Sequence, residues 1–282
     1  MRKIYITIFT MILAIIMVFP LIITITNSFM GDQEVLGNYE TVKSGEVAQT
    51  EKYINFQIIP ERATLYQYYN VLVVKNKYIK MFWNTTFIVL PLVLGHVLVA
   101  SSAAFAFSKL KFKYKDTLFF LYIVVMLMPF QVTLVPNYLI LDRLNLINSY
   151  QSIILPGIFS AFGVFLLKQF MDGIPNECIE AAAVDGCNTF QIFYKIVLPL
   201  CKEGIAALTI LFFIENWNMV EQPLVFIKDI NKYPLSLYLS NVNHFELGIA
   251  FASGVIYMIP MLLIFLYGEE YITEGIKHSD IK

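Results

Sequence analysis

The sequence predicts an all-α protein that crosses a membrane several times, and three observations support this fold class. The 282 residues are 58% hydrophobic and only 15% charged, with a mean hydropathy of +0.66. Soluble domains usually carry about a quarter charged residues, so an ordinary soluble globule is excluded. The charges are also unevenly spread, because several long intervals contain none. Crossing a bilayer takes about 20 mostly apolar helical residues, and intervals of this length are much too long for barrel strands.

Six segments satisfy this length requirement and are predicted to be membrane-spanning helices. The fifth is the least regular, because it contains Glu215 and Glu221. Prolines inside the segments are compatible with helix, since neighbouring helices can satisfy the freed carbonyls. The first segment is longer than a usual signal-peptide core and has no A-x-A cleavage site, so we expect an uncleaved anchor. The predicted spans are residues 4–29, 82–108, 117–140, 150–170, 204–226 and 248–268.

The placement of Lys and Arg predicts the orientation of these spans. Eleven basic residues lie on the side that holds both termini, and three lie in short loops on the other side, so both termini are predicted to be cytoplasmic. Residues 32–80 form a longer extracytoplasmic loop with six acidic and six basic residues. Its Tyr66, Tyr68 and Tyr69 suit either a docking surface or a small amphipathic cap on the bundle. The net charge of −1 gives no field that favours nucleic acid.

Residues that bind metals or carry out covalent chemistry give little signal. Cys178, Cys187 and Cys201 lack C-x-x-C spacing, so free thiols are expected, and the three histidines are too far apart to predict a metal site. His96, inside a span, suits either a proton relay or a hydrogen-bonded interior position. The Asn-Thr-Thr sequence at Asn84 fits a glycosylation sequon at the membrane edge. No P-loop pattern occurs, so the chain is not expected to bind ATP itself.

The most informative polar stretch is the loop of residues 172–199, which we expect to be a compact helix-turn-helix on the cytoplasmic side. Gly186 is placed to close the first helix in a left-handed conformation. Asn188 and Gln191 have the spacing of a capping box for the second helix. The predicted boundaries are Asn176–Asp185 for the first helix and Asn188–Pro199 for the second.

The first of these helices has a distinctive surface. Glu177 and Glu180 are three residues apart and share a face. The small side chains of Ala181 to Ala183 would let another protein approach the helix closely. An acidic helix with little bulk suits a socket on a partner, and an ordinary solvated connector fits the residues equally well.

The sequence of this loop, EAAAVDGCNTFQIFYKIVLP, resembles the inner-membrane permease subunits of binding-protein-dependent ABC importers. It matches the family signature of E-A-A, three residues, Gly, nine residues and I-x-L-P. The resemblance is strongest to the sugar branch typified by the maltose permeases, as the second permease of a pair. Residues 128–141, residues 144–169 and the Trp217-Asn218 pair also look like sugar-branch segments. The signature residues are Glu180, Ala181, Ala182, Gly186, Ile196, Leu198 and Pro199.

The resemblance implies a type I importer permease fold whose loop supplies a coupling helix for a cleft on the cytoplasmic ATPase. Glu180 would then make the polar contact, while Ala181 and Ala182 would permit close packing. Gly186 would set the bend, and Ile196 and Pro199 would anchor the loop to the bundle. The full set of predicted ATPase-coupling residues is Glu177, Glu180, Ala181, Ala182, Asp185, Gly186, Ile196, Leu198 and Pro199.

The family also implies a function and a set of partners. The function is translocation of a carbohydrate across the bacterial cytoplasmic (inner) membrane by alternating access, with no covalent step on this chain. Its partners would be a second homologous permease in a heterodimer, an ATPase dimer that binds ATP and Mg, membrane lipid and an extracytoplasmic solute-binding protein. The loop of residues 228–246 lies where family members extend toward the binding protein.

Some residues depart from the family pattern. Glu203 stands where a proline is usual, and Glu215 stands where a small residue is more common. A carboxylate within a span should face a partner or a wet path. Glu215, with Asn216 and Asn218, is therefore predicted to line the substrate path, and an internal hydrogen bond is the structural alternative. An ion-coupled secondary transporter of small polar solutes is the alternative function, supported only by Glu215 and His96.

Overall fold

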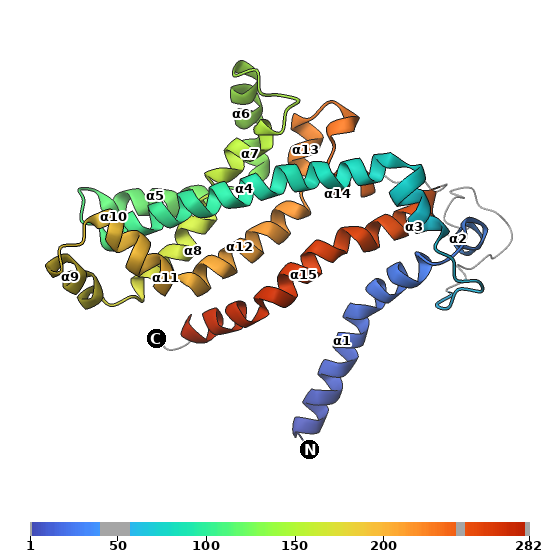
Figure 1. Ribbon diagram of the computed structural model, residues 1–282, viewed down its shortest axis with the longest axis horizontal. Helices are drawn as coiled ribbons and strands as arrows, with labels where there is room; N and C mark the ends of the chain where they lie inside the picture. Colours follow the sequence, from blue (N-terminus) through green and yellow to red (C-terminus); the bar gives the residue numbers. More distant parts are fainter. Residues whose placement is uncertain (1, 40–56, 241–245, 280–282) are drawn as a thin grey trace. The chain divides into compact units, whose positions relative to one another are not determined.

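The computed structural model describes residues 2–39, 57–240 and 246–279, which are almost entirely helical (Figure 1). This confirms the predicted all-α class. The longer helices are α1 (Arg2–Asn27), α4 (Asn76–Lys109), α5 (Lys115–Met126), α6 (Phe130–Arg143), α8 (Ala161–Asp172), α12 (Lys202–Trp217) and α15 (Leu247–Ser279). The shorter ones are α2 (Asp32–Tyr39), α3 (Tyr66–Tyr69), α7 (Gln151–Ile158), α9 (Asn176–Val184), α10 (Thr189–Ile192), α11 (Leu198–Leu200), α13 (Glu221–Phe226) and α14 (Leu235–Leu239).

Within the described ranges, four helical segments are long and apolar enough to cross a membrane. They are Lys3–Asn27, Asn76–Lys109, Gln151–Asp172 and Leu247–Glu270. Two further pairs of helices meet the same test only when each pair is taken together. Lys115–Met126 and Phe130–Arg143 meet at a bend of 100°, and Thr189–Leu200 and Lys202–Trp217 meet at a bend of 74°. The total reaches the predicted six if each bent pair is one span.

The third predicted span, residues 117–140, is not one continuous helix. The chain leaves α5 after Met126 and starts α6 at Phe130, immediately after Pro129. Pro129 has an extended backbone, with ψ of 138°, and its ring nitrogen has no hydrogen to donate to a preceding turn. The proline therefore breaks the helix here, where the sequence reading allowed only a kink.

The fifth predicted span, residues 204–226, is also interrupted. α12 ends at Trp217, and a short turn leads to α13, which starts at Glu221. Trp217, the last residue of α12, and Met219, within the turn, are both buried. Apolar composition alone therefore overstated the length of the helix.

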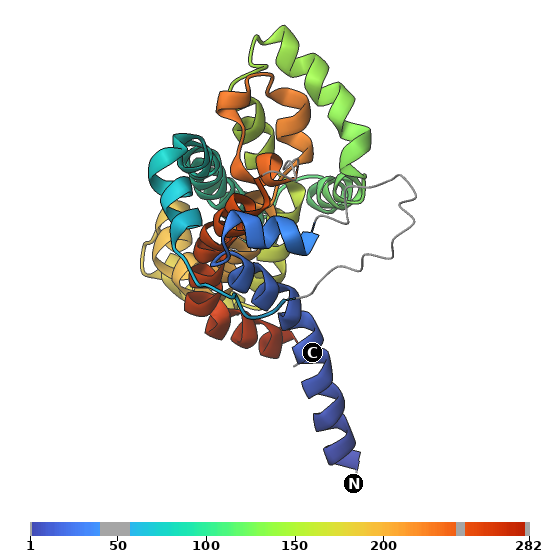
Figure 2. The ribbon, with the colours of Figure 1, turned by 90° about the vertical axis from the view of Figure 1, so that its right-hand side faces the viewer.

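The described residues divide into two compact units, the first consisting of Met1–Trp83 and Leu237–Pro260. In this unit α1 exposes an apolar surface over most of its length, while its C-terminal end packs beneath α2 and α3 (Figure 2). Ser28 Oγ and Tyr68 Oη are 2.7 Å apart, and Gln67 Nε2 donates to Asp32 Oδ1 at 2.7 Å. These bonds make the described part of the 32–80 loop a cap on its own unit. Residues 40–56 lie outside the described ranges.

The second unit consists of Asn84–Ser236 and Met261–Lys282. Its core is formed along α4, where Ile88, Leu92, Ala100 and Ala104 are fully buried. α8 packs against both α5 and α12 in the same unit. This unit contains the loop that joins α8 to α12, and α4 runs through its length (Figure 1).

His96 illustrates how closely the helices of the second unit pack. Its Nδ1 lies 3.0 Å from the carbonyl oxygen of Ile158, at the end of α7, and its ring stacks on Phe212 at 3.9 Å. A Cβ atom at Gly163 would lie only 2.2 Å from His96 Nε2, so glycine is required for this approach. The hydrogen-bonded interior position, rather than the proton relay, agrees with these contacts.

Candidate functional site

The first helix of the predicted loop, α9, has well-defined ends and projects at one end of the second unit (Figure 1). It begins directly after Pro175, whose extended backbone suits the residue before a helix, and it runs over Asn176–Val184. Gly186 closes it with φ of +83°, which glycine adopts without steric cost. The backbone N–H groups of Gly186 and the next residue bond to carbonyls of the last turn at 3.1 and 3.0 Å. The predicted helix and its left-handed closure are confirmed, with the helix one residue shorter.

One face of α9 is fully available to a partner. Glu177, Glu180, Ala181 and Val184 are spaced so that they share a helix face, and all four are exposed. Val184 is 87% exposed, although it is the most apolar of the four. The face therefore combines two carboxylates with a small residue and a protruding apolar side chain, which suits a socket that is apolar at its base and basic at its rim.

The signature residues differ in their burial, which bears on the roles that the resemblance implies for them. Ala182 is only 6% exposed and lies on the inner side of α9, so it supports the helix from within instead of facing a partner. Pro199 is exposed, so it does not anchor the loop by burial. Ile196 is half-buried, and the fully buried side chain beside it is Val197. Leu198 is also half-buried, while Asp185 and Gly186 are exposed at the turn.

The second arm of the loop begins with the predicted capping box, which is confirmed. Asn188 Oδ1 accepts from the backbone N–H of Gln191 at 2.8 Å, and Gln191 Oε1 accepts from that of Asn188 at 2.9 Å. A π-helical turn, Phe193–Val197, then precedes α11. Pro199 has no N–H for the carbonyl four residues earlier, which favours this wider turn. The capping box satisfies two backbone N–H groups at the start of α10.

The root of the loop is held by the end of α4. Lys109 Nζ donates to the carbonyl oxygen of Ile174 at 2.6 Å and to Asn176 Oδ1 at 3.2 Å. Ser108 Oγ donates to Asp172 Oδ1 at 2.7 Å. We call these contacts the root clamp. They join the end of α4 to both sides of the turn between α8 and α9.

Sequence reasoning missed several of these residues. Val184 was detectable, because it follows Glu177 by seven positions and so returns to the same face of the helix. Phe190 and Tyr194, which are 72% and 64% exposed on the second arm, carry no comparable signal because aromatic residues abound in the chain. Lys109 had no signal at all, since its partners are about 65 positions away.

The residues predicted to line a substrate path lie at the end of α12. Glu215 and Asn218 are exposed, and Asn216 is half-buried. The Asn216 amide donates to the carbonyl of Phe212 at 2.8 Å, and the Asn218 amide donates to that of Ile214 at 2.8 Å. Both asparagines therefore donate to carbonyls of α12, and the Asn218 amide also donates to Met261 Sδ on α15 at 3.3 Å. Glu215 presents its carboxylate on the surface of the isolated chain.

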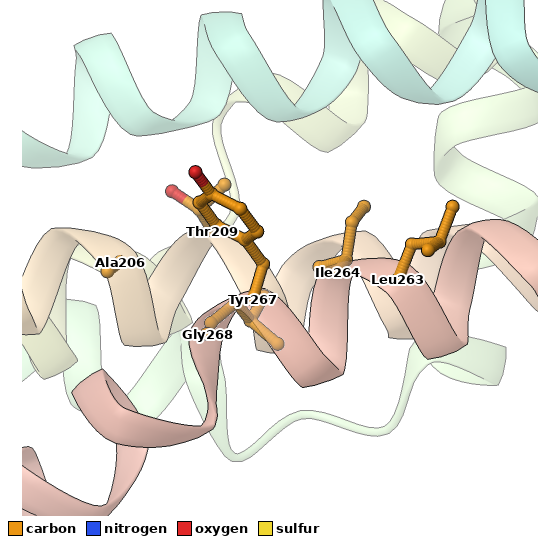
Figure 3. A pocket seen from close by; sticks show the side chains of 7 residues that line it. Ala206, Thr209, Leu263, Ile264, Tyr267 and Gly268 are labelled. Carbon is orange, nitrogen blue, oxygen red and sulfur yellow. The ribbon is translucent and has the colours of Figure 1, made fainter.

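A groove of about 450 Å³ lies between α12 and the C-terminal part of α15 (Figure 3). Thr209 and Tyr267 supply the polar side chains among its lining residues. Thr209 Oγ1 donates to the carbonyl of Ile205 at 2.7 Å, and Tyr267 is 90% exposed. A mostly apolar groove of this kind suits an acyl chain or an apolar side chain, not a polar solute. It is lined by Ala206, Thr209, Ile210, Leu263, Ile264, Tyr267 and Gly268.

Among the residues that the structure describes, no three His, Cys, Asp or Glu side chains come together to hold a metal ion. Cys178, Cys187 and Cys201 have free thiols there, and only Cys201 is buried. The geometry provides an exposed helix face on α9 and an exposed carboxylate, Glu215, near the end of α12.

Comparison with known proteins finds transport permease proteins that match most of this chain. AraQ of Halalkalibacterium halodurans, an arabinooligosaccharides transport system permease protein, is 28% identical over 96% of this chain and 93% of its own length. A probable ABC transporter permease protein of Pyrococcus horikoshii is 33% identical over 68% of this chain and 71% of its own. UgpE of Pectobacterium atrosepticum, an sn-glycerol-3-phosphate transport system permease protein, is 28% identical over 71% of this chain and 73% of its own.

A solved structure has the same fold. The crystal structure of a bacterial ABC transporter involved in the import of the acidic polysaccharide alginate matches with a TM-score of 0.78 and 23% identity, over 96% of each chain. The family described as "Binding-protein-dependent transport system inner membrane component" matches residues 96–276, which include the whole loop of residues 172–199. The chain is therefore a member of the family of binding-protein-dependent transport system inner membrane components.

Proposed function

We propose that this chain is one of two permease subunits of an importer for carbohydrate, and that α9 is the helix through which a separate ATPase dimer drives it. The exposed face of α9 carries this proposal. A short helix fixed by Gly186 and by the capping box at Asn188 presents two carboxylates and Val184 without internal partners among the described hydrogen bonds. A rigid projection can be seated in a socket with little loss of conformational entropy.

The solute class is proposed from the names of the relatives and from one charge. AraQ is named for arabinooligosaccharides, and UgpE is named for sn-glycerol-3-phosphate. The membrane-embedded charge that this chain offers on α12 is the carboxylate of Glu215, which accepts hydrogen bonds from hydroxyl groups and repels a phosphate. A neutral oligosaccharide therefore suits the chain better than a glycerol phosphate.

The proposed mechanism is alternating access. ATP and Mg bind to the ATPase dimer, whose closure moves α9, and the two permeases change from inward-open to outward-open. This chain contributes a lever and half of the path, and it makes or breaks no covalent bond. The companion permease, forming a heterodimer, contributes the other half, and an extracytoplasmic binding protein delivers the solute.

The proposed orientation places α9, both termini and the lysine-rich turn after α4 in the cytoplasm. Lys111 and Lys113 of that turn are exposed beside the end of a span, as the positive-inside rule requires. Asp142 and Arg143, at the end of α6, then lie on the extracytoplasmic side.

Charge reversal at Glu180 tests the coupling assignment. The complex is purified with its companion subunits and reconstituted in vesicles, and uptake of arabinotriose, maltotriose and sn-glycerol-3-phosphate is measured with internal ATP. Reversing a charge that is buried at an interface costs about 2–5 kcal/mol. We therefore expect Glu180→Lys to reduce uptake about 100-fold, at about 1.4 kcal/mol for each factor of ten.

Asp116→Lys is the matched control, because it reverses an exposed carboxylate at the start of α5, outside the loop. It should keep normal uptake. Normal ATPase binding and uptake in Glu180→Lys would reject the coupling role of α9. Uptake of the phosphate ester alone by the unaltered complex would reject the carbohydrate assignment.

A further inference from the structure

We propose that Lys109 is a positioning residue of the transport cycle, which makes α4 follow the displacement of α9. This inference rests on the proposed function, because it assumes that α9 receives the motion of the ATPase. It assigns the next step, from the moving helix into the bundle, to the root clamp at the end of α4.

Lys109 engages the start of α9 from two directions. Its ammonium group bonds to the carbonyl oxygen of Ile174 at 2.6 Å and to the side chain of Asn176 at 3.2 Å. Ile174 is 7% exposed, so its carbonyl belongs to a well-packed turn, and Asn176 is the first residue of α9. One cation therefore holds both the backbone before α9 and its first side chain.

The other half of the clamp holds the end of α8. Asp172, the last residue of α8, accepts from Ser108 Oγ at 2.7 Å through one oxygen and pairs with Lys168 Nζ at 2.6 Å through the other. The pair with Lys168 lies within α8 and orients the carboxylate, so the bond from Ser108 is the one that joins the two helices. The end of α4 is thus joined on both sides of the three-residue turn, and α9 cannot tilt freely about that turn.

The end of α4 is itself well fixed. Lys115 Nζ donates to the carbonyl oxygens of Ser108 and Leu110 at 3.0 and 3.2 Å. These carbonyls have no partner within the helix, so Lys115 provides the closing bonds. Lys109 therefore extends from a rigid support, in contrast to Lys111 and Lys113, which are exposed on the turn that follows.

A rigid α4 can carry the displacement across the membrane. Ala104, Ala100, Leu92 and Ile88 are fully buried along the helix, so its core-facing side is packed without freedom to deform. Pro91 lies inside α4, and from Leu92 to Lys109 the helix extends for about 26 Å at about 1.5 Å per residue. A shift applied at Lys109 therefore reaches this far into the second unit as a motion of the helix.

The test uses the complete complex in lipid nanodiscs, with its ATPase, companion permease and binding protein. Two quantities are measured: retention of the ATPase during purification, and the ratio of ATP hydrolysis with and without the binding protein. We expect Lys109→Met to retain the ATPase but to lose about tenfold in this stimulation ratio. Lys109→Arg, which keeps the donors, should recover most of it, and Lys111→Met should behave as the unaltered complex.

A covalent tether provides the sharper test. Lys109→Cys and Asn176→Cys together remove the bond, and a short bis-methanethiosulfonate crosslinker then replaces it. If the bond acts as a tether, crosslinking restores the stimulation ratio, while Lys109→Cys alone, treated alike, does not recover. The background lacks the native thiols through Cys178→Ser, Cys187→Ser and Cys201→Ala.

Three outcomes would overturn the inference: normal stimulation in Lys109→Met, loss of the ATPase itself from that variant, or no recovery after crosslinking. Loss of the ATPase would mean that Lys109 shapes the docking surface and transmits nothing. Failure of the underlying function is separately visible, because the unaltered complex would then show no stimulation and Glu180→Lys would change nothing.

Discussion

Within the second unit, the two ends of α4 hold their neighbouring loops with different kinds of groups, which are neutral at one end and charged at the other. At one end, Asn84 is 5% exposed and donates to the carbonyls of Asn231 and Tyr233 at 2.8 and 3.0 Å, while it accepts from Tyr150 Oη at 2.8 Å. All of these groups are neutral. At the other end, the root clamp uses the charged groups of Lys109 and Asp172, and Asp172 is 32% exposed.

The difference indicates different roles for the two ends. A buried neutral network leaves unsatisfied groups in an apolar interior when it is broken, so it serves to fix the fold. Breaking a contact between half-exposed charges costs less free energy, because water can take the place of the lost partner. We therefore expect variants at the Asn84 end to lose stability, and variants at the Lys109 end to lose coupling while they remain folded.

The largest expected effect is that of Asn84→Leu. The substitution keeps the approximate volume but leaves two carbonyls and one hydroxyl without their partner. Each unsatisfied buried group costs about 1–3 kcal/mol, so the free energy of unfolding should fall by about 3 kcal/mol or more. Unfolding in mixed detergent micelles, followed by tryptophan fluorescence and circular dichroism, measures the change.

Asn231→Ala is the matched control for that measurement. Asn231 is exposed, and its backbone carbonyl, which Asn84 contacts, survives the substitution. Its loss should stay below about 1 kcal/mol, as for most surface positions. Equal losses in the two variants would contradict the assignment of the Asn84 network as the fixed end.

Much of the fold followed from the sequence because its signals are local. Apolar length identified the helical segments, and the order of residues around Gly186 and Asn188 identified both arms of the loop of residues 172–199. Capping and left-handed closure depend on neighbours within a few positions, so one sequence suffices to detect them. The signature from Glu180 to Pro199 then supplied the family.

The features that could not be predicted depend on distant contacts. The sequon-like position Asn84 is instead a buried hydrogen-bonding residue, because it meets carbonyls about 147 positions away. Lys109 reads as one of several membrane-edge lysines until α8 and α9 are placed beside it. The inward face of Ala182 and the break at Pro129 likewise depend on how helices pack, which apolar composition does not specify.

An intermediate effect is expected from Glu215→Gln, which alters neither end of α4. Hydrogen bonds to charged groups contribute about 1.5–3 kcal/mol, so loss of the charge should reduce uptake about tenfold. Stability and the stimulation of ATP hydrolysis should stay normal. This result would separate an effect on solute transport from effects on folding stability and on coupling to the ATPase. Glu221→Gln, at the start of the neighbouring α13, makes the same chemical change as a control. Unchanged uptake by Glu215→Gln would remove this carboxylate from the path.

The smallest expected effect concerns a charged clamp in the first unit, formed around Glu246. It tests whether the contribution of such a clamp to stability changes with pH. Glu246 accepts from Lys75 Nζ at 2.8 Å and from Tyr78 and Tyr238 Oη at 3.0 and 3.1 Å. The ammonium of Lys75 lowers the pKa of Glu246 below its ordinary value, with the two hydroxyls adding to the effect against partial burial.

The sign of the pH dependence follows from this lowered pKa. Protons bind the unfolded carboxylate more readily, so the clamp contributes its full stability above the ordinary glutamate pKa of about 4.3. That contribution disappears as the pH falls through the lower folded value. Because both side chains are partly exposed, it should amount to about 1 kcal/mol or less.

Glu246→Gln should therefore be less stable than the unaltered protein at pH 7 and nearly equal to it at about pH 3. Lys75→Met should show the same convergence, and combining the two substitutions should add little. The difference in unfolding free energy between variant and unaltered protein could instead stay constant from pH 7 to pH 3. Lys75 and Glu246 would then not be energetically coupled. The contrast between charged contacts that water can replace and the buried neutral network at Asn84 would lose its support.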